Sequence, residues 1–253
     1  MKSAKISPSS NETYDAFAPY YRKYSQKKAD YIKAIDALIL GNLPRNIESV
    51  LDIGCGDGIR LEALLKKAGF SQVWGIDSSS EMVSLARSNT NARIVQADIG
   101  NSDIEALLPI KFDAIFCLWN VLGHIDGDAA RNRAILNMSK VLDEGGQIYI
   151  DVSNRHNIKH YGWKTVLKNV LADYLHPDRD NGTLSYEIRV TADKSIRAHS
   201  HFFNPSELLP LFANAGLSLV KTAYIDYATG KKAGAWSGNV LYILERSEKK
   251  NAG

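Results

Sequence analysis

The chain has 253 residues, of which 31 are basic and 28 acidic, and its formal net charge at pH 7 is +3. This length suits one α/β domain with a small insertion, and the nearly balanced charge, without a long basic block, argues against a large nucleic-acid footprint. No apolar stretch approaches the about 18–20 residues of a membrane span, and Cys55 and Cys117 are too few for a disulfide framework, so we expect a soluble, cytoplasmic protein.

The first 45 residues are expected to form a tail and two helical segments. Residues 1–11 are polar and predict a mobile tail. The following segment forms either an amphipathic helix packed on the core or a lid that closes over a ligand. Its aromatic residues are Tyr14, Phe17, Tyr20, Tyr21 and Tyr24. A second helix, ending at Gly41 and Pro44, is predicted by the apolar stripe Ile32, Ile35, Leu38 and Ile39.

A strand, a glycine turn and a helix follow one another from residue 49. The apolar run Ser49 to Ile53 predicts a buried strand, and Gly54, Gly56 and Gly58 precede a helix that stops at Gly69. This order opens a nucleotide-binding βαβ unit. Asp52 and Asp57 would lie unfavourably beside a pyrophosphate, so a ligand without phosphates, preferably a cation, fits better.

Strands and helices then alternate. We expect strands at 72–76, 92–97, 112–118 and 147–152, the first ending at Asp77 and the second at Asp98. Ser78 begins a Ser-x-x-Glu capping box, and a later helix begins at Asp126 or Asp128 and is stopped by residues 143–146. The alternation predicts a Rossmann-like, doubly wound sheet whose ligand lies at the carboxyl ends of the strands.

The pattern changes after residue 152. The sequence predicts a helix at 163–175 and an antiparallel hairpin of residues 184–190 and 196–203. A helix at 205–215 and strands at 217–225 and 239–246 are expected to follow, with a loose loop between the two strands and a frayed tail from residue 247. We therefore divide the chain into a tail and lid (1–45), a cofactor-binding core (46–152), an insertion that caps the substrate site (153–204) and the C-terminal part of the core (205–253).

Four motifs carry a resemblance to a known family. Residues 51–58 (LDIGCGDG), 75–77 (GID), 96–98 (QAD) and 112–115 (FDAI) resemble, in order and spacing, the class I S-adenosylmethionine-dependent methyltransferases. The resemblance covers about residues 47–152. It implies a seven-stranded sheet that is parallel except for an antiparallel last strand, S-adenosylmethionine as the cofactor and S-adenosylhomocysteine as the product.

The resemblance also implies roles for individual residues. Asp77 would accept hydrogen bonds from both ribose hydroxyls, Asp98 and the Ile99 backbone would contact adenine, and Asp52 or Asp57 would face the sulfonium or amino group. Met82 either covers the adenine or is a core residue. The predicted cofactor-binding residues are Asp52, Gly54, Cys55, Gly56, Gly58, Asp77, Ser78, Met82, Asp98, Ile99, Leu118, Tyr14 and Tyr21.

A nicotinamide-dependent dehydrogenase is the alternative that shares the strand, turn and helix. Its Gly-x-Gly-x-x-Gly pattern, started at Gly54, would require a glycine where the chain has Ile59. The third glycine is Gly58, as in the methyltransferases, so the motif disfavours the dehydrogenase.

Residues 118–124 follow the fourth strand, where we expect substrate chemistry. The Asn/Asp-Pro-Pro-aromatic motif of nucleic-acid amino-methyltransferases is lacking, which argues against methylation of a flipped base. His124 either accepts a proton from the substrate or holds the loop by hydrogen bonds. Positioning supplies much of the catalysis of an in-line displacement, so no base is obligatory.

The insertion supplies most of the remaining candidates. His156 and His160, with His199 and His201, form two pairs that could in principle hold a metal, but no carboxylate or cysteine cluster reinforces them, and we predict none. The predicted substrate-binding residues are Trp119, Asn120, Tyr161, Tyr186, Arg197, His199 and His201. Tyr161 and Tyr186 would help to roof a compact pocket.

The sequence thus predicts a methyltransferase, monomeric or homodimeric, that acts on a nitrogen or oxygen atom of a small metabolite. An RNA-modifying (tRNA) methyltransferase and a non-catalytic S-adenosylmethionine-binding protein are the alternatives. Neither the substrate, the accepting atom nor the number of methyl groups transferred follows from the sequence.

Overall fold

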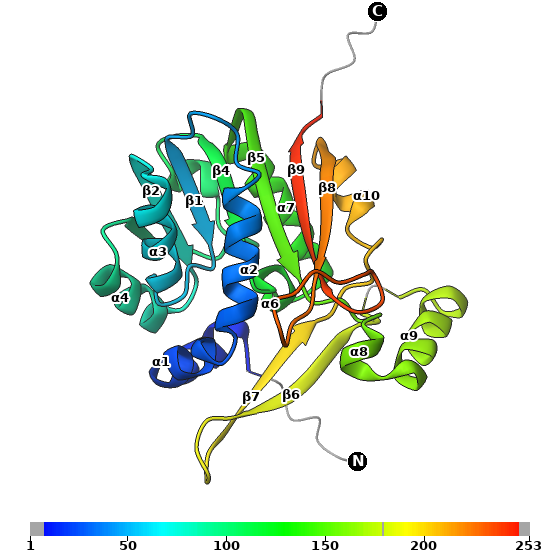
Figure 1. Cartoon of the computed structure of the whole chain (residues 1–253). Coiled ribbons are helices and arrows are strands. Elements are labelled where there is room, and N and C mark those ends of the chain that lie inside the picture. The colour runs from blue at the N-terminus through cyan, green and yellow to red at the C-terminus, as the bar shows by residue number, and fades with distance from the viewer. Residues whose placement is uncertain (1–7, 179, 248–253) are drawn as a thin grey trace, which may run out of the picture.

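The structure, a computed structural model, describes residues 8–178 and 180–247. Its main sheet has the spatial order β3-β2-β1-β4-β5-β9-β8 (Figure 1). All neighbouring strands are parallel except β9, which is antiparallel to β5 and β8, so the predicted sheet is confirmed. The strands are β1 (Ser49–Ile53), β2 (Gln72–Asp77), β3 (Arg93–Gln96), β4 (Phe112–Cys117), β5 (Leu142–Val152), β8 (Leu217–Ile225) and β9 (Asn239–Arg246).

The central strands are buried on both faces, which explains their nearly continuous apolar sequence. In β1, Val50 packs into one core, whereas Leu51 and Ile53 pack into the other. Figure 1 shows α2 and α3 on one side of the sheet and α7 and α10 on the other. One core contains side chains of α2 (Ala29–Leu40), α3 (Ile59–Ala68) and α4 (Ser80–Asn89). The other contains side chains of α5 (Ile104–Leu107), α6 (Val121–His124), α7 (Asp128–Val141) and α10 (Leu209–Asn214).

The strand order reverses between β1 and β4, because the chain continues from β1 to β2 and β3 on one side and from β4 to β5 on the other. At such a reversal, ligands bind beyond the carboxyl ends of the strands. In Figure 1 these ends point toward α1 and the two-stranded β6–β7 sheet. The remaining helices and strands are α1 (Ser10–Gln26), α8 (Ile158–Tyr161), α9 (Trp163–Leu175), β6 (Thr183–Arg189) and β7 (Ser195–His201).

The helix at 163–175 and the antiparallel hairpin are confirmed, but four local predictions are wrong. The N-terminal polar segment does not extend to residue 11, because Ser9 caps α1 and accepts a hydrogen bond from the Glu12 backbone. The cap of α4 is Ser79 and not Ser78, since the Ser79 hydroxyl accepts a hydrogen bond from Met82 N at 3.1 Å. Residues 1–7 and 248–253, which include the predicted tails, lie outside the described residues.

The other two errors concern element ends. Residues 143–146 do not form a stop between helix and strand, because β5 already begins at Leu142, which pairs with Phe112 before a register shift. Helix α10 begins four residues late, since Asn204 and Glu207 hold the preceding residues in a turn: Asn204 N donates to Glu207 Oε2 at 3.0 Å. Among the helices described, none has both the length and the apolar character needed to cross a membrane.

Candidate active site

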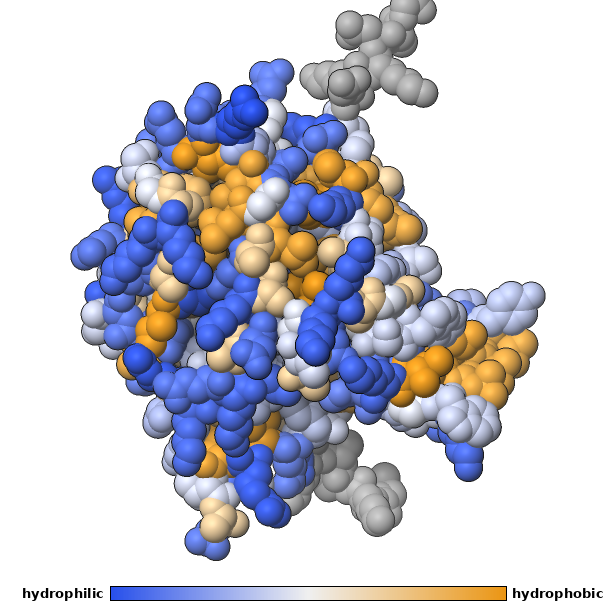
Figure 2. All heavy atoms as spheres, in the orientation of Figure 1, coloured by the Kyte–Doolittle hydropathy of each residue, from blue (hydrophilic) through white to orange (hydrophobic). Residues whose placement is uncertain are grey.

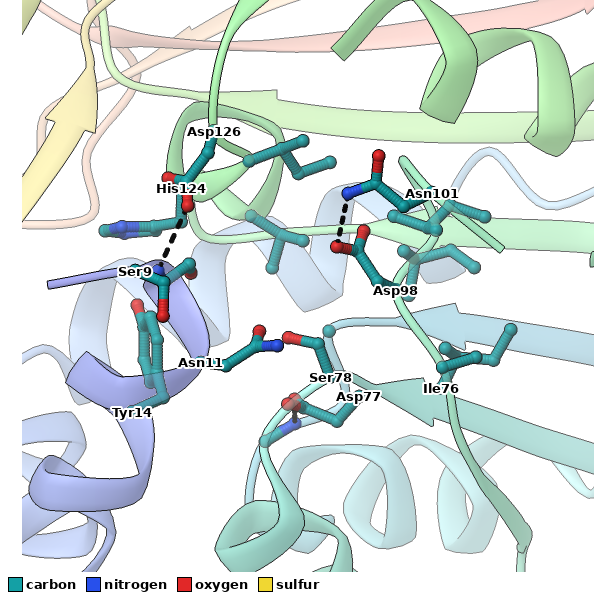
Figure 3. A pocket seen from close by; sticks show the side chains of 18 of the residues that line it. Ser9, Asn11, Tyr14, Ile76, Asp77, Ser78, Asp98, Asn101, His124 and Asp126 are labelled. Carbon is teal, nitrogen blue, oxygen red and sulfur yellow. Dashed lines mark hydrogen bonds between the residues drawn. The ribbon is translucent and has the colours of Figure 1, made fainter. Parts of the chain in front are cut away.

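A cavity of about 310 Å³ lies at the carboxyl ends of the central strands, beneath the start of α1 (Figure 3). It contains nine of the thirteen predicted cofactor-binding residues: Gly54, Gly56, Asp77, Ser78, Asp98, Ile99, Leu118, Tyr14 and Tyr21. We call it the first cavity. Its remaining wall is formed by Ser9, Ser10, Asn11, Ile53, Ile76, Ala97, Asn101, Trp119, Val121, His124, Ile125 and Asp126.

Asp77, the last residue of β2, is the most constrained acid of this cavity. Its Oδ2 accepts a hydrogen bond from Gly56 N at 2.9 Å and its Oδ1 accepts one from Ser79 N at 2.9 Å. Burial raises the pKa of Asp77, while these backbone donors oppose the shift. The carboxylate therefore ties the glycine turn to the start of α4 and still lines the cavity.

Asp98 holds the loop after β3. Its Oδ1 accepts from Gly100 N at 2.8 Å and its Oδ2 from Asn101 Nδ2 at 2.7 Å, so the loop carries Ile99 and Asn101 into the wall (Figure 3). On the opposite side, Figure 3 shows Asn11 of α1 directed toward Ser78. Polar groups from α1 and from the sheet thus face one cavity.

The glycine turn packs closely against two side chains of the cavity wall, those of Val121 and Tyr21. Gly54 and Gly56 have φ values of +68° and +57°. A Cβ on Gly54 would lie 2.5 Å from Val121 Cγ2, and one on Gly56 would lie 3.0 Å from the Tyr21 hydroxyl. Larger residues are strained in this backbone conformation, and their Cβ atoms would lie too close to these two side chains. The turn therefore requires glycine at both positions.

Four predicted cofactor-binding residues do not line the first cavity. Met82 is fully buried, which favours its interpretation as a core residue, and Cys55 is buried in the core that α2, α3 and α4 share. Gly58 faces Ala86 of α4, since a Cβ there would lie 3.0 Å from the Ala86 Cα. Asp52 is buried inside β1, and burial raises its pKa to about 7. Asp57 also lies outside this wall, its Oδ1 accepting from Ile59 N at 3.3 Å.

The donor set of the first cavity fits S-adenosylmethionine. Of the described residues, no lysine or arginine lines it, whereas Asp77, Asp98 and Asp126 do. Carboxylates suit ribose hydroxyls, an adenine amino group and a cation, and repel phosphates. Asp77 and the glycine turn would hold the ribose and methionine portions, and Asp98 and Ile99 the adenine.

A second cavity of about 300 Å³ adjoins the first, because Tyr14, Tyr21, Trp119 and His124 line both. Aromatic side chains from α1, the β4–α6 loop, the insertion and the β8–β9 loop surround it. Of the predicted substrate-binding residues, Trp119, Asn120, Tyr161 and Tyr186 line this cavity. Its further lining residues are Phe17, Tyr24, Lys28, Ser153, His160, Ile188, Ser200, Phe202, Tyr227 and Asn239.

His124 lies where the two cavities meet. Its ring packs edge-on against that of Tyr14, with the centroids 5.3 Å apart. Burial lowers the pKa of His124 to about 4, so the imidazole is neutral at pH 7 and can accept a proton. A backbone hydrogen bond to His199 opposes the shift and orients the ring, which means that the two sequence-based interpretations of His124 are compatible.

The loop before α6 is held in a conformation that non-glycine residues rarely adopt. Trp119 and Asn120 have φ values of +58° and +62°. Asp151 holds them: its Oδ2 accepts from Trp119 N at 3.0 Å, and its backbone oxygen accepts from Asn120 N at 2.9 Å. Such backbone persists where surrounding contacts over-determine it, often at functional sites. The loop presents the Trp119 ring to both cavities.

Three predicted substrate-binding residues do not line the second cavity. His199 pairs instead with Asp126, and Arg197 is exposed. His201 is fully buried, with its ring nitrogens 3.0 Å from Thr183 Oγ1 and 2.7 Å from Glu207 Oε1. Instead, the cavity is lined by Ser200 of β7 and by Phe202, the residue that follows this strand.

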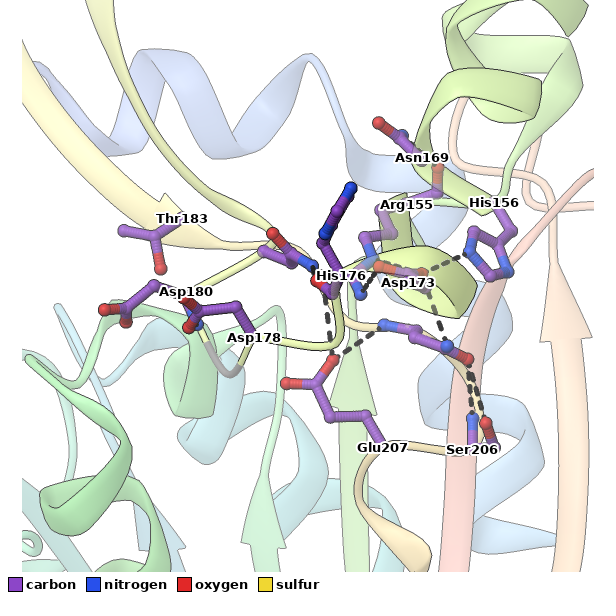
Figure 4. Close-up of polar contacts among 12 residues, drawn as sticks. Arg155, His156, Asn169, Asp173, His176, Asp178, Asp180, Thr183, Ser206 and Glu207 are labelled. Carbon is purple, nitrogen blue, oxygen red and sulfur yellow. Dashed lines mark hydrogen bonds and ion pairs between the residues drawn. The ribbon is translucent and has the colours of Figure 1, made fainter. Parts of the chain in front are cut away.

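The two histidine pairs do not meet. His156 Nε2 lies 2.9 Å from Asp173 Oδ2 in a network with Arg155 (Figure 4), and His160 lines the second cavity. Within residues 8–178 and 180–247, no group of three or more histidine, cysteine, aspartate or glutamate side chains is arranged to hold a metal ion.

Several residues that line the two cavities were not among the site residues predicted from the sequence. Phe17 and Tyr24 belong to the aromatic segment that was already a lid candidate, so periodicity could have found them. Lys28, Asn101 and Tyr227 carry no local signal, because a helix cap, a turn and a loop look the same whether or not a cavity lies beside them.

Comparison with known proteins agrees with this geometry. The family model of the methyltransferase domain matches residues 50–146. A ubiquinone biosynthesis O-methyltransferase of Azoarcus sp. is 30% identical over 183 residues, which are 71% of this chain and 68% of that protein. A solved S-adenosylmethionine-dependent methyltransferase of Clostridium acetobutylicum superposes with a TM-score of 0.61 at 19% identity, covering 92% of this chain and 99% of that one. The CcbJ methyltransferase of Streptomyces caelestis gives 0.64 at 18% identity, covering 85% and 94%.

The fold, the acidic first cavity and these relatives define an enzyme that transfers methyl groups. The chain belongs to the class I S-adenosylmethionine-dependent methyltransferases. When bound, the cofactor supplies a methyl group already activated by a sulfonium.

Proposed function

We propose that this enzyme methylates an oxygen or nitrogen atom of a small metabolite that binds in the second cavity. The observation that carries the proposal is the shared wall: Tyr14, Tyr21, Trp119 and His124 border both cavities, so an acceptor in one would lie beside a methyl donor in the other. A cavity of about 300 Å³ surrounded by aromatic rings suits a small molecule better than a polymer.

The chain's own groups would position the acceptor and remove its proton. The cofactor would supply the methyl group and leave as S-adenosylhomocysteine, and the acceptor atom would need a free lone pair to receive that group. The proton of a hydroxyl acceptor would pass to neutral His124 during the transfer, and that of an ammonium acceptor would have to leave before it. The tyrosines are unsuited to this task, because burial raises the pKa of Tyr14 well above 10 and that of Tyr186 to about 12. The O-methyltransferase relatives favour a hydroxyl.

Methyl-¹³C S-adenosylmethionine tests the proposal. The enzyme is incubated with a small-molecule extract or, separately, with RNA, and the chemical shift of the labelled product distinguishes O-methyl from N-methyl. We expect label in a small molecule. Label in RNA alone would support the RNA-modifying alternative, and S-adenosylhomocysteine binding without any transfer would support a non-catalytic role.

A matched pair of tyrosine variants locates the acceptor. Tyr186 lines only the second cavity, whereas Tyr174 on α9 is 83% exposed. Tyr186→Ala should lower transfer at least about tenfold and leave S-adenosylhomocysteine affinity unchanged, while Tyr174→Ala should change neither. Equal transfer by the two variants would place the acceptor elsewhere.

A further inference from the structure

Among the described residues, Lys28 is the one lysine, arginine or acid in the wall of the second cavity. It is the N-cap of α2 and is partly buried. Among the described residues, no other lysine, no arginine and no carboxylate lines this cavity. The wall therefore has one positive charge among aromatic and neutral polar groups.

No carboxylate compensates this charge. Within the described part of the chain, Lys28 forms no ion pair, and its Nζ lies 4.1 Å from the centroid of the Tyr227 ring. Tyr227 is itself held, since its hydroxyl oxygen accepts a hydrogen bond from Trp119 Nε1 at 3.2 Å. Burial lowers the pKa of Lys28, and no neighbouring acid opposes the shift. A ring face stabilises an ammonium less than an anion does.

Lys28 and His124 occupy different parts of the wall of the second cavity. His124 lines both cavities, whereas Lys28 lines only the second, so the ammonium is separated from the methyl donor's side of the site. The side chains of Trp119, Tyr161, Tyr186, Phe202 and Tyr227 surround the same cavity and suit a flat, apolar body.

We propose, on the basis of the function proposed above, that Lys28 binds a carboxylate of the substrate, and that the substrate is a small aromatic or apolar acid with its nucleophilic atom beside His124. A single ammonium matches a monoanionic carboxylate. A phosphate dianion is usually bound by several cationic donors at once, whereas Lys28 is the one lysine or arginine among the described residues of this wall.

Two probes of nearly equal size and shape, one anionic and one neutral, test the charge preference. Calorimetry compares 3-hydroxybenzoate with neutral 3-hydroxybenzamide on the S-adenosylhomocysteine-bound enzyme. The acid should bind the wild type about tenfold more tightly or better. Lys28→Met should abolish the preference and Lys28→Arg should keep most of it. The matched control Lys27→Met, at the exposed neighbouring residue, should keep all of it.

Equal affinity of the wild type for the two probes, including failure of both to bind, overturns the proposal, as does an acid preference that survives Lys28→Met. The affinity of each variant for S-adenosylhomocysteine reports whether its fold is intact.

A second arm separates this proposal from the proposed function. A small-molecule extract is split on an anion exchanger, and methyl transfer is measured with each fraction. The acceptor should be in the retained fraction and should survive alkaline phosphatase. An acceptor in the unretained fraction, or one destroyed by phosphatase, overturns the role of Lys28 and leaves the proposed function standing. Transfer to neither fraction contradicts the proposed function itself.

Discussion

Asp77 holds the glycine turn and the start of α4 with a carboxylate that also lines the first cavity. Because it accepts hydrogen bonds from Gly56 N and Ser79 N, its oxygens are oriented before any ligand binds. Preorganised acceptors of this kind strengthen a hydrogen bond to a ligand, since little reorganisation remains to be paid. Among the residues of the first cavity, we therefore expect removal of the Asp77 side chain to weaken ligand binding most.

Asp77→Ala should weaken S-adenosylhomocysteine binding by about 1.5–3 kcal/mol, the range for hydrogen bonds to a charged group, or about 10- to 150-fold in Kd. Calorimetry measures this loss directly. Asp103→Ala, at an exposed acid before α5, is the control and should bind normally. Unchanged affinity of Asp77→Ala would remove Asp77 from the binding site.

His124→Asn should lower kcat by about 10²–10⁴-fold if the imidazole removes the acceptor's proton, because asparagine can hydrogen-bond but is not a base. The wild-type rate should remain on a plateau as pH falls toward about 4, where the buried imidazole becomes protonated, and then decline. A pH–rate profile of both proteins is the measurement. If the variant keeps the wild-type profile, His124 only holds the loop.

At the scale of elements, α1 closes both cavities and is held at two places. Asp15 Oδ1 accepts from Ser79 Oγ at 2.6 Å and from Glu81 N at 3.2 Å, which joins the middle of α1 to the start of α4. Asp126 Oδ2 accepts from Ser10 N at 3.3 Å, and its other oxygen pairs with His199 of β7. Side chains on α4, the α6–α7 loop and β7 thus fix the helix over the site.

Asp15→Ala should therefore raise the dissociation rate of S-adenosylhomocysteine about tenfold, because the helix that covers the first cavity loses its contact with α4. Stopped-flow tryptophan fluorescence measures the rate, since Trp119 lines that cavity. Lys23→Ala, at an exposed residue of α1, should leave the rate unchanged. An unaltered rate in Asp15→Ala would mean that α1 is not a lid.

Within the insertion, a buried charge network joins α9 to the residues that follow β5 (Figure 4). Asp173 of α9 pairs with Arg155 and His156, and the Arg155 and Asp173 side chains are only 9% and 11% exposed. Asp173→Ala should lower the free energy of unfolding by about 3 kcal/mol, because it leaves the buried guanidinium without its main partner. Denaturation in urea measures this. Asp178→Ala, at an exposed acid of the next loop, should cost little, and an equal loss in the two variants would contradict the explanation.

At the scale of the whole molecule, buried acids couple folding to pH. Burial raises the pKa values of Asp52, Asp77 and Asp151. A carboxyl whose pKa is higher in the folded state binds protons more tightly there. It therefore contributes stability that is present below the unfolded pKa and is lost as pH rises through the folded pKa.

Asp52→Asn removes the ionisation of an acid whose folded pKa is about 7. Between pH 4 and 7, the stability of the free wild type should therefore fall more steeply with pH than that of the variant, by at most about 1.4 kcal/mol per pH unit for one proton. Urea denaturation at several pH values checks this, with the exposed Asp103→Asn as the control. Parallel slopes would show that Asp52 titrates normally.

Local patterns determined the order of the strands and helices, the glycine turn, and the placement of Asp77 and Asp98 at one edge. The physical reason is that side-chain periodicity and backbone conformation are encoded within a few residues, and that parallel strands bring their carboxyl ends together. Local patterns could not determine which face of an element is covered. The alternation in β7 showed that His199 and His201 share a face, but Ser200 and Phe202 face the cavity.

Only the tertiary structure decided which residues surround the second cavity. Met82 is in the core, α1 lies over both cavities, and Lys28 and Tyr227, 199 residues apart by their numbers in the sequence, meet at one wall. Such contacts depend on how separate elements pack, and no spacing within one element encodes them. The sequence alone was therefore sufficient to identify the methyl donor. The second cavity could not be predicted in this way, because it forms where the insertion, α1 and the β8–β9 loop pack together.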